Sequence, residues 1–213
     1  MRNWQSIMAR LKISPTRSNL LRINKSLAMA RQGYTLLDRK REVLTMNLMR
    51  MAHDAEVVQQ QVDGLLAAAY AALRVANLTM GREMVDWASL ATVGQADVRV
   101  LLRSIMGVVV PTVELQGEPP ALSFGLGDTT AGLDEARTKF RQALDLLPTL
   151  AESVSSVWRL AAELQRTQRR VNALEYLFIP QYDETAKFIE EALEEKDREE
   201  RFRLKRVKSL SAR

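Results

Sequence analysis

The sequence contains no cysteine and a single histidine, His53, among its 213 residues. Without cysteine the chain can form neither a disulfide framework nor a thiolate metal site, and one histidine excludes metal sites built on a histidine pair. Aromatic residues make up only 6% of the chain, which is typical of long helices that pack through Leu, Ala, Met and Val. No apolar run approaches the roughly 18 residues of a membrane span, and residues 1–13 show no signal-peptide pattern. We therefore expect a cytoplasmic protein.

The net charge of +5 conceals an uneven distribution along the chain. Residues 1–41 hold ten Lys or Arg and one acid, Asp38, and residues 201–213 hold six Lys or Arg and no acid. The remainder, residues 42–200, carries 15 basic and 25 acidic residues. Basic ends on an acidic body are compatible with nucleic acid, an acidic membrane surface or an acidic protein pocket as partner, and equally with simple solubility.

An apolar stripe runs from Leu20 to Ala76 at alternating steps of three and four residues. A strict seven-residue repeat stays on a partner helix only when the two helices supercoil, left-handed. At 1.5 Å per residue this stripe is roughly 85 Å long, which predicts a rod. Its positions, with one charged member, are Leu20, Ile23, Leu27, Ala30, Tyr34, Leu37, Arg41, Leu44, Leu48, Met51, Ala55, Val58, Val62, Leu65, Ala69, Ala72 and Ala76.

A second stripe begins at Leu133 and reaches Leu193. Its step to Leu174 comes one residue early, which predicts local overwinding of the supercoil. Pro148 and Pro180 lie inside it, and because the spacing resumes after each, we expect kinks and not helix ends. Its positions are Leu133, Ala136, Phe140, Ala143, Leu147, Leu150, Val154, Val157, Ala161, Leu164, Gln168, Val171, Leu174, Phe178, Tyr182, Ala186, Ile189 and Leu193.

The middle of the chain, residues 77–132, holds seven of the nine glycines and three of the six prolines. Residues 108–115 are β-branched and extended in character, and residues 117–120 (GEPP) carry a turn signal. We expect a small β-hairpin with a return strand at 121–125. Residues 97–104 are expected to form a further strand or a short helix.

The two stripes flank this middle segment, so the chain is expected to fold back on itself. The predicted fold is mainly α: a long antiparallel left-handed two-helix coiled coil with a small middle segment containing a β-hairpin. Pairing Ala76 near Leu133 gives a register in which opposed residue numbers sum to about 209, and it sets basic residues of the first helix against acidic residues of the second. The expected divisions are residues 1–13 as an N-terminal extension, 14–78 as the first helix, 79–129 as the middle segment, 130–208 as the second helix and 209–213 as a tail.

Short motifs at both ends of the chain carry a family resemblance. Ser14 and Pro15 predict a helix start, with Ser14 as the N-cap. From there Pro15-Thr16-Arg17, Asn19-Leu20-Leu21, Gly33, Leu36-Leu37 and Lys40-Arg41-Glu42 resemble the N-terminal signature of the D subunit of the rotary V/A-type ATPases. The same family is resembled by Arg169-Arg170-Val171-Asn172-Ala173-Leu174-Glu175, Ile179-Pro180, the segment 202–208 (FRLKRVK), and in the middle Ser104-Ile105-Met106-Gly107-Val108 with Val110-Pro111.

The resemblance implies a non-catalytic rotor shaft, the central stalk, that transmits torque between ATP hydrolysis or synthesis in a catalytic ring and ion transport in a membrane ring. It implies as partners the alternating catalytic and nucleotide-binding A and B subunits of the ring, the small F subunit of the central stalk, and a funnel-shaped subunit above the membrane ring. It implies no nucleic acid and no membrane insertion, and a cytoplasmic position peripheral to the membrane. From the residues themselves we expect no catalytic, cofactor or metal site, and residues 125–128 (GLGD) lack the ending of a phosphate loop.

Several residues are candidates for partner contact. Gly33 costs a helix about 1 kcal/mol against alanine, which indicates either a close approach by another subunit or a tolerated defect. Met46 and Met49 lie off the stripe, where flexible methionines suit a docking surface. The basic, partly apolar end of the second helix is expected to protrude and to sit in the collar of the ring, although a solvated tail is the simpler alternative. The complete set is Arg17, Arg22, Lys25, Gly33, Met46, Met49, Arg169, Arg170, Arg201, Phe202, Arg203, Lys205 and Arg206.

Two other classes of protein share some of these features. A basic coiled coil that binds nucleic acid through phosphate contacts would also carry basic ends, but interleaved aromatics are lacking here and the body is acidic. A coiled-coil chaperone would expose an apolar patch to unfolded clients. Steeply salt-dependent RNA binding would favour the first class, and co-purification with ATPase subunits would argue against both.

Overall fold

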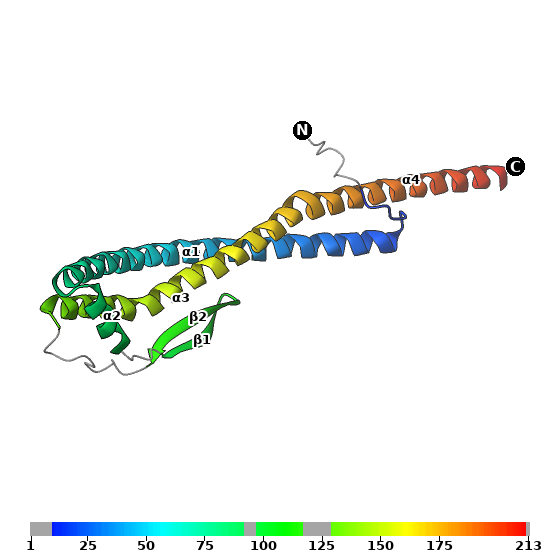
Figure 1. The fold of residues 1–213 in the computed structure, drawn as a ribbon. Coiled ribbons are helices and arrows are strands. Elements are labelled where there is room, and N and C mark those ends of the chain that lie inside the picture. Colours follow the sequence, from blue (N-terminus) through cyan, green and yellow to red (C-terminus); the bar gives the residue numbers. More distant parts are fainter. Residues whose placement is uncertain (1–9, 92–96, 117–128, 212–213) are drawn as a thin grey trace, which may run out of the picture. The chain divides into compact units, whose positions relative to one another are not determined.

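The computed structural model describes residues 10–91, 97–116 and 129–211, and it is mainly helical with one two-stranded antiparallel hairpin (Figure 1). The predicted fold class is confirmed. The elements in chain order are α1 (Arg17–Met80), α2 (Arg82–Ala91), β1 (Asp97–Ile105), β2 (Val108–Gln116), α3 (Ala131–Ala173), the π-helix η2 (Leu174–Phe178) and α4 (Ile179–Ser211).

Helix α1 is a single run of 64 residues, roughly 95 Å along its axis. It begins two residues after Pro15, and its N-cap is Thr16, whose Oγ1 accepts the Asn19 N–H at 3.3 Å. The prediction that Ser14 caps the helix was therefore wrong. Ser14 precedes a proline, which disfavours helical backbone, and its carbonyl instead accepts the Asn19 side-chain amide at 2.8 Å. The helix ends at Gly81, which takes a φ of 82° and donates its N–H to the Asn77 carbonyl.

The first stripe is confirmed along its whole length. Every position from Leu20 to Ala76 that the three-four spacing selects is buried or half-buried. The fully buried members include Leu44, Val62 and Ala69. Leu21, an apolar residue off the stripe, stays exposed, whereas Leu66 and Leu73 off the stripe are half-buried. The repeat therefore located the centre of the packed face of α1 but not its full width.

The chain divides into two compact units, of which the first consists of residues 1–43 and 164–213. Its core gathers Ile23 of α1 with Ala186 and Ile189 of α4. Arg41 lies across from Gln168, with Nη1 to Oε1 at 3.5 Å. These opposed residue numbers sum to about 209, so the predicted register is confirmed in this unit.

The second unit consists of residues 44–163. Its core brings Ala76 of α1 against Leu133 of α3 and Val85 of α2. Tyr70 and Phe140 meet edge to face with ring centroids 5.2 Å apart. Ala76 with Leu133 and Tyr70 with Phe140 both give residue numbers that sum to about 209, so the register holds independently in the second unit.

The second stripe is confirmed at most of its positions, but Phe178 is 39% exposed and the packed positions are displaced by one residue in the middle. Leu147 and Val154, which the spacing assigns to the packed face, are 39% and 38% exposed, whereas Ser156 and Leu160 are fully buried. The displacement has a physical cause, because the hairpin covers α3 through Glu152 and, two turns later, Arg159. Ser156 lies between these two on the same side of the helix, so α3 is covered there from a second direction.

A π-helix occupies the place where overwinding was predicted. In η2 the turns are wider, not tighter, and Ile179 donates its N–H to the Leu174 carbonyl five residues earlier. Pro180 explains this, because it has no N–H and its ring excludes the carbonyl four residues before it. The stripe positions Leu174, Phe178 and Tyr182 are each four residues apart in the sequence, a spacing that suits a wider turn. The helix also continues through Pro148, so the prediction that neither proline ends it is confirmed.

Both strands of the hairpin fall on segments for which a strand was predicted, in the case of 97–104 as one of two alternatives, but their pairing with each other was not predicted. Strand β2 matches the predicted extended segment, but its partner is β1, with Ile105 opposite Val108 and Asp97 opposite Gln116. The turn lies at Met106 and Gly107, both with positive φ (54° and 81°). The predicted turn at 117–120 and return strand at 121–125 lie outside the described residues. Helix α2, in the predicted middle segment, was not foreseen.

Candidate partner-binding surfaces

Two cross-helix ion pairs mark the basic end of α1 in the first unit. Arg17 reaches Asp197 at 3.5 Å and Arg31 reaches Asp183 at 3.4 Å. Lys187 donates to Asp183 at 2.9 Å; this hydrogen bond and charge, followed by the charge of Arg31, lower the pKa of Asp183. Exposed pairs contribute little stability, so their chief effect is on helix orientation. The neighbouring candidates Arg22 and Lys25 are exposed.

Residues 10–13 lie against α4 in the same unit. Leu11 donates its backbone N–H to Thr185 Oγ1 at 3.2 Å, and Arg10 places its guanidinium 3.4 Å from the centre of the Phe188 ring. Leu11 and Ile13 also pack on the core around Ile189. This segment therefore covers α4 well before its C-terminal end.

A polar layer interrupts the apolar stripe near η2. Arg41 bonds Asp38 at 2.7 Å and approaches Gln168, and Gln168 donates to Asn172 at 2.7 Å. Next to this layer the carboxylate of Glu175 is the largest cause of a raised pKa at Tyr34.

The other candidates near η2 fall into two environments. Gly33 is half-buried and faces η2, because a Cβ built there would meet Leu174 Cδ1 at 3.9 Å. Arg169 and Arg170 precede η2 and are exposed. Gly33, from the N-terminal group of family motifs, therefore faces Leu174, from the motif at residues 169–175, across the helix pair.

The C-terminal end of α4 is exposed along its whole surface. Every residue from 198 to 210 is exposed, including the apolar side chains of Phe202, Leu204 and Val207 at 71%, 64% and 62%. Among the described residues, Arg198 pairs only with acids of its own helix, Glu194 and Glu195. The candidates Arg201, Phe202, Arg203, Lys205 and Arg206 all lie on this surface, which we call the α4 tip (residues 198–210).

Exposed apolar side chains also mark the second unit. Met46 and Met49 are 67% and 69% exposed, as their off-stripe positions predict. A shallow apolar groove on the same unit is lined by Leu66, Phe140 and Leu144, among others. Trp87 and Leu90 of α2 are more than 70% exposed, as is Trp158 of α3. The sequence analysis missed these three, although the strong amphipathic spacing of α2 could have located the first two.

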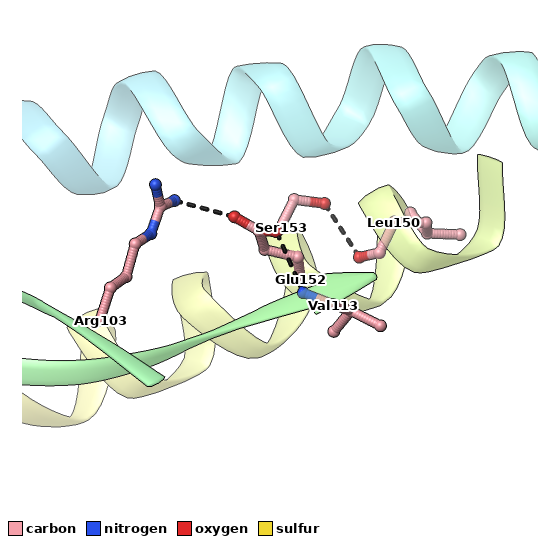
Figure 2. Close-up of polar contacts among 5 residues, drawn as sticks. All are labelled: Arg103, Val113, Leu150, Glu152 and Ser153. Atoms are coloured by element: carbon pink, nitrogen blue, oxygen red, sulfur yellow. Dashed lines mark hydrogen bonds and ion pairs between the residues drawn. The ribbon is translucent and has the colours of Figure 1, made fainter. Parts of the chain in front are cut away.

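The hairpin is held to α3 by a carboxylate that binds both strands. Glu152 accepts Arg103 of β1 at 2.8 Å and the Val113 N–H of β2 at 3.4 Å (Figure 2). Arg159 donates to the Val109 carbonyl at 2.8 Å. The hairpin therefore has a defined position in this unit.

Within the described ranges no cluster of three or more His, Cys, Asp or Glu side chains could hold a metal ion. None of the helices in those ranges combines the length and apolar character that crossing a membrane requires. The candidate surfaces described above, the α4 tip and the exposed methionines, carry apolar and basic side chains.

The sequence matches known proteins over nearly its whole length. Residues 19–209 match the family described as the ATP synthase D subunit. The chain is 38% identical over 203 residues to the V-type ATP synthase D subunit of Thermotoga neapolitana, covering 95% of this chain and 100% of the relative. It is 40% identical over 200 residues to the A-type ATP synthase D subunit of Methanopyrus kandleri (93% and 86% covered) and 36% identical over 203 residues to that of Pyrococcus furiosus (94% and 95%).

Proposed function

The chain belongs to the family of ATP synthase D subunits, and on that premise we propose that it is the non-catalytic central rotor shaft of a rotary V/A-type ATPase. It transmits torque between ATP hydrolysis or synthesis in a catalytic ring and ion transport in a membrane ring. Its partners in this proposal are the A and B subunits of the ring, the small F subunit of the stalk and a funnel-shaped subunit that links the stalk to the membrane ring. It works in the cytoplasm, peripheral to the membrane.

The observation that carries this proposal is the register of the helix pairs. In both units α1 runs against the returning helix with opposed residue numbers that sum to about 209. A pair of helices locked in register resists sliding under load, because each stripe residue is held by the facing helix. A shaft that transmits torque needs this property, and neither an RNA-binding arm nor a client-binding chaperone does.

The α4 tip supplies the bearing in this proposal. Its basic side chains guide the end of the shaft past acidic walls of the collar, and Phe202, Leu204 and Val207 give weak apolar contact. Weak contacts suit a bearing, because a tight site would stall rotation. The exposed methionines Met46 and Met49 provide the docking surface for the small stalk subunit.

Removing residues 201–213 tests the bearing. The truncated chain should fold with the helicity expected for its length and still bind its stalk partners, because the removed residues that the structure describes are exposed. Retention in the catalytic ring, or coupling of hydrolysis to ion pumping, should fall. If the truncated chain kept its affinity for the ring and full coupling, the α4 tip would be a solvated tail with no role in the ring.

The double variant Met46→Glu with Met49→Glu tests the docking surface. It should weaken binding of the small stalk subunit by about tenfold or more, because two desolvated contacts are replaced by charges. Met29→Glu is the matched control, since Met29 is 60% exposed on the same helix but in the other unit. Equal affinity for the double variant and the control would place the docking surface elsewhere.

A further inference from the structure

The two edges of the β1–β2 hairpin are unlike each other. Because Ile105 and Val108 flank a two-residue turn, they form a hydrogen-bonded pair, and such pairs alternate with non-hydrogen-bonded ones along the ladder. The residues whose N–H and C=O point outward are therefore the ones in between. They are Val98, Val100, Leu102 and Ser104 on β1, and Val109, Pro111, Val113 and Leu115 on β2.

The outer edge of β2 is closed. Its Val109 carbonyl accepts Arg159 and its Val113 N–H donates to Glu152, both from α3. Pro111 lies between them and has no N–H to offer. Figure 1 accordingly draws β2 on the α3 side of the hairpin and β1 on the outside.

The outer edge of β1 is open. Its outward N–H and C=O groups form no hydrogen bond to any described residue, and every residue from Asp97 to Ser104 is exposed. The strand carries no proline and no bulge, the usual means by which proteins block a free edge. Nine residues of straight, unblocked strand give an edge roughly 30 Å long.

The face of the hairpin that carries these outward residues is apolar as well. Val98, Val100 and Leu102 are 51%, 55% and 67% exposed. They stand opposite Leu115, Val113 and Pro111 on β2, of which Leu115 is exposed, Val113 half-buried and Pro111 buried. The other face is the one that turns to α3, where Val110 is buried and Arg103 reaches Glu152. The apolar face is therefore uncovered chiefly along β1, and a two-stranded hairpin of this kind gains stability from another strand.

We propose that the β1 edge accepts an extended segment of another subunit of the ATPase complex as a third strand of this sheet. Main-chain hydrogen bonds at Val98, Val100, Leu102 and Ser104 hold the added strand, as in other cases of strand addition. Its alternate apolar side chains continue the exposed side of this face along β1. An acidic side chain on its other face lies beside Arg99, which is exposed, stands opposite Glu114 of β2 and makes no ion pair with a described residue.

A second copy of this chain fits the edge less well. In the antiparallel register that pairs all nine residues of two β1 strands, Arg99 of one copy stands directly opposite Arg103 of the other. Like charges directly opposite each other destabilise a ladder. The charge on this strand therefore favours a partner with an acidic residue, and the inference rests on the proposed function only in that this partner belongs to the complex.

Hydrogen exchange of single amides tests the proposal. In the isolated chain the outward amides of Val98, Val100, Leu102 and Ser104 should exchange freely, while those of Arg99, Leu101 and Arg103 are protected by β2. After reconstitution with the purified ring, small stalk and funnel-shaped subunits, added singly and together, the outward amides should slow at least about tenfold. If exchange at these amides is unchanged in a complex that forms and hydrolyses ATP, the proposal of an added third strand is wrong, while the rotor proposal is unaffected.

Two further arms complete the test. Val100→Pro removes one outward N–H and should weaken the partner complex several-fold, up to about tenfold; Pro111 at the equivalent place on β2 shows that the hairpin tolerates this change. Val100→Thr keeps the N–H and is the matched control, and protected Leu101 and Arg103 amides report an intact hairpin. The proposal would be overturned if Val100→Pro and Val100→Thr weakened the partner complex equally. It would also be overturned if the outward amides of β1 exchanged slowly in the isolated chain at high concentration, or if the reconstituted complex failed to assemble.

Discussion

Gly33 of α1 faces Leu174, the first residue of the π-helix, with room for one methyl group: a Cβ at Gly33 would lie 3.9 Å from Leu174 Cδ1. That separation is an ordinary van der Waals contact, so packing within the chain does not require glycine at this position. The glycine instead weakens α1 at the point where the facing helix has its widest turn.

Gly33→Ala should therefore raise the free energy of unfolding of the isolated chain by about 1 kcal/mol. Urea denaturation followed by circular dichroism measures it. If Gly33 admits a close approach by another subunit, the same variant should bind its complex less tightly while being more stable alone. A destabilised isolated chain would show that the glycine is needed for folding of the helix pair itself.

Tyr34 provides a pH test of the contact with η2. The carboxylate of Glu175, then burial and Asp38, raise its pKa above the ordinary 10.0. The folded chain holds the phenol neutral to higher pH than the unfolded chain does, so stability should be lost as pH rises above 10.0 through the raised pKa.

Absorbance titration of the phenolate, taken as the difference between the protein and Tyr34→Phe, gives the midpoint for this residue. Glu175→Gln should move that midpoint down towards 10.0. A midpoint that Glu175→Gln leaves in place would mean that η2 does not lie against Tyr34.

Two buried hydroxyls should behave in opposite ways when removed. Ser156 is fully buried and makes no hydrogen bond to a described residue, whereas Thr185 accepts the Leu11 N–H and donates to the Gln181 carbonyl. Ser156→Ala should leave the free energy of unfolding unchanged or raise it by up to about 1 kcal/mol, and Thr185→Ala should lower it by about 1–2 kcal/mol. Denaturant titration of both variants checks the order, and the reverse order would contradict it.

The register can be tested by a disulfide, because the chain has no native cysteine. Leu27→Cys with Tyr182→Cys should cross-link efficiently under oxidising conditions, since a disulfide needs Cα atoms within roughly 7 Å. Leu27→Cys with Ile189→Cys is the matched control, displaced by one heptad. Cross-linking of the control pair alone would show that the register is wrong.

How far the sequence predicts this fold depends on how many neighbours a segment has. The stripe on α1 was predictable because one facing helix explains nearly all of its burial. On α3 the hairpin covers a second side, so the buried Ser156 and Leu160 do not follow the spacing set by the first partner. An apolar seven-residue repeat predicts only the face of a helix that packs on one partner helix.

The pairing of β2 with β1 was not predicted, for a different reason. Its true turn places Met106 at a φ of 54°, a backbone region that Asn, Asp and Gly signal and methionine does not. The glycine and prolines at 117–120 are a stronger turn signal, and for that reason the turn was predicted there and not at Met106 and Gly107. For the candidate sites, the exposure of Met46, Met49 and the α4 tip followed from the pattern, whereas the open β1 edge needed the strand pairing itself.

The most direct test of the rotor is to watch the chain turn. A single cysteine introduced at an exposed position such as Arg82 can carry a bead in an assembled complex whose catalytic ring is fixed to a surface. On addition of ATP, the account predicts stepwise rotation of the bead in one direction, which stops when ATP is removed. A bead that stays still while the same complexes hydrolyse ATP would contradict it.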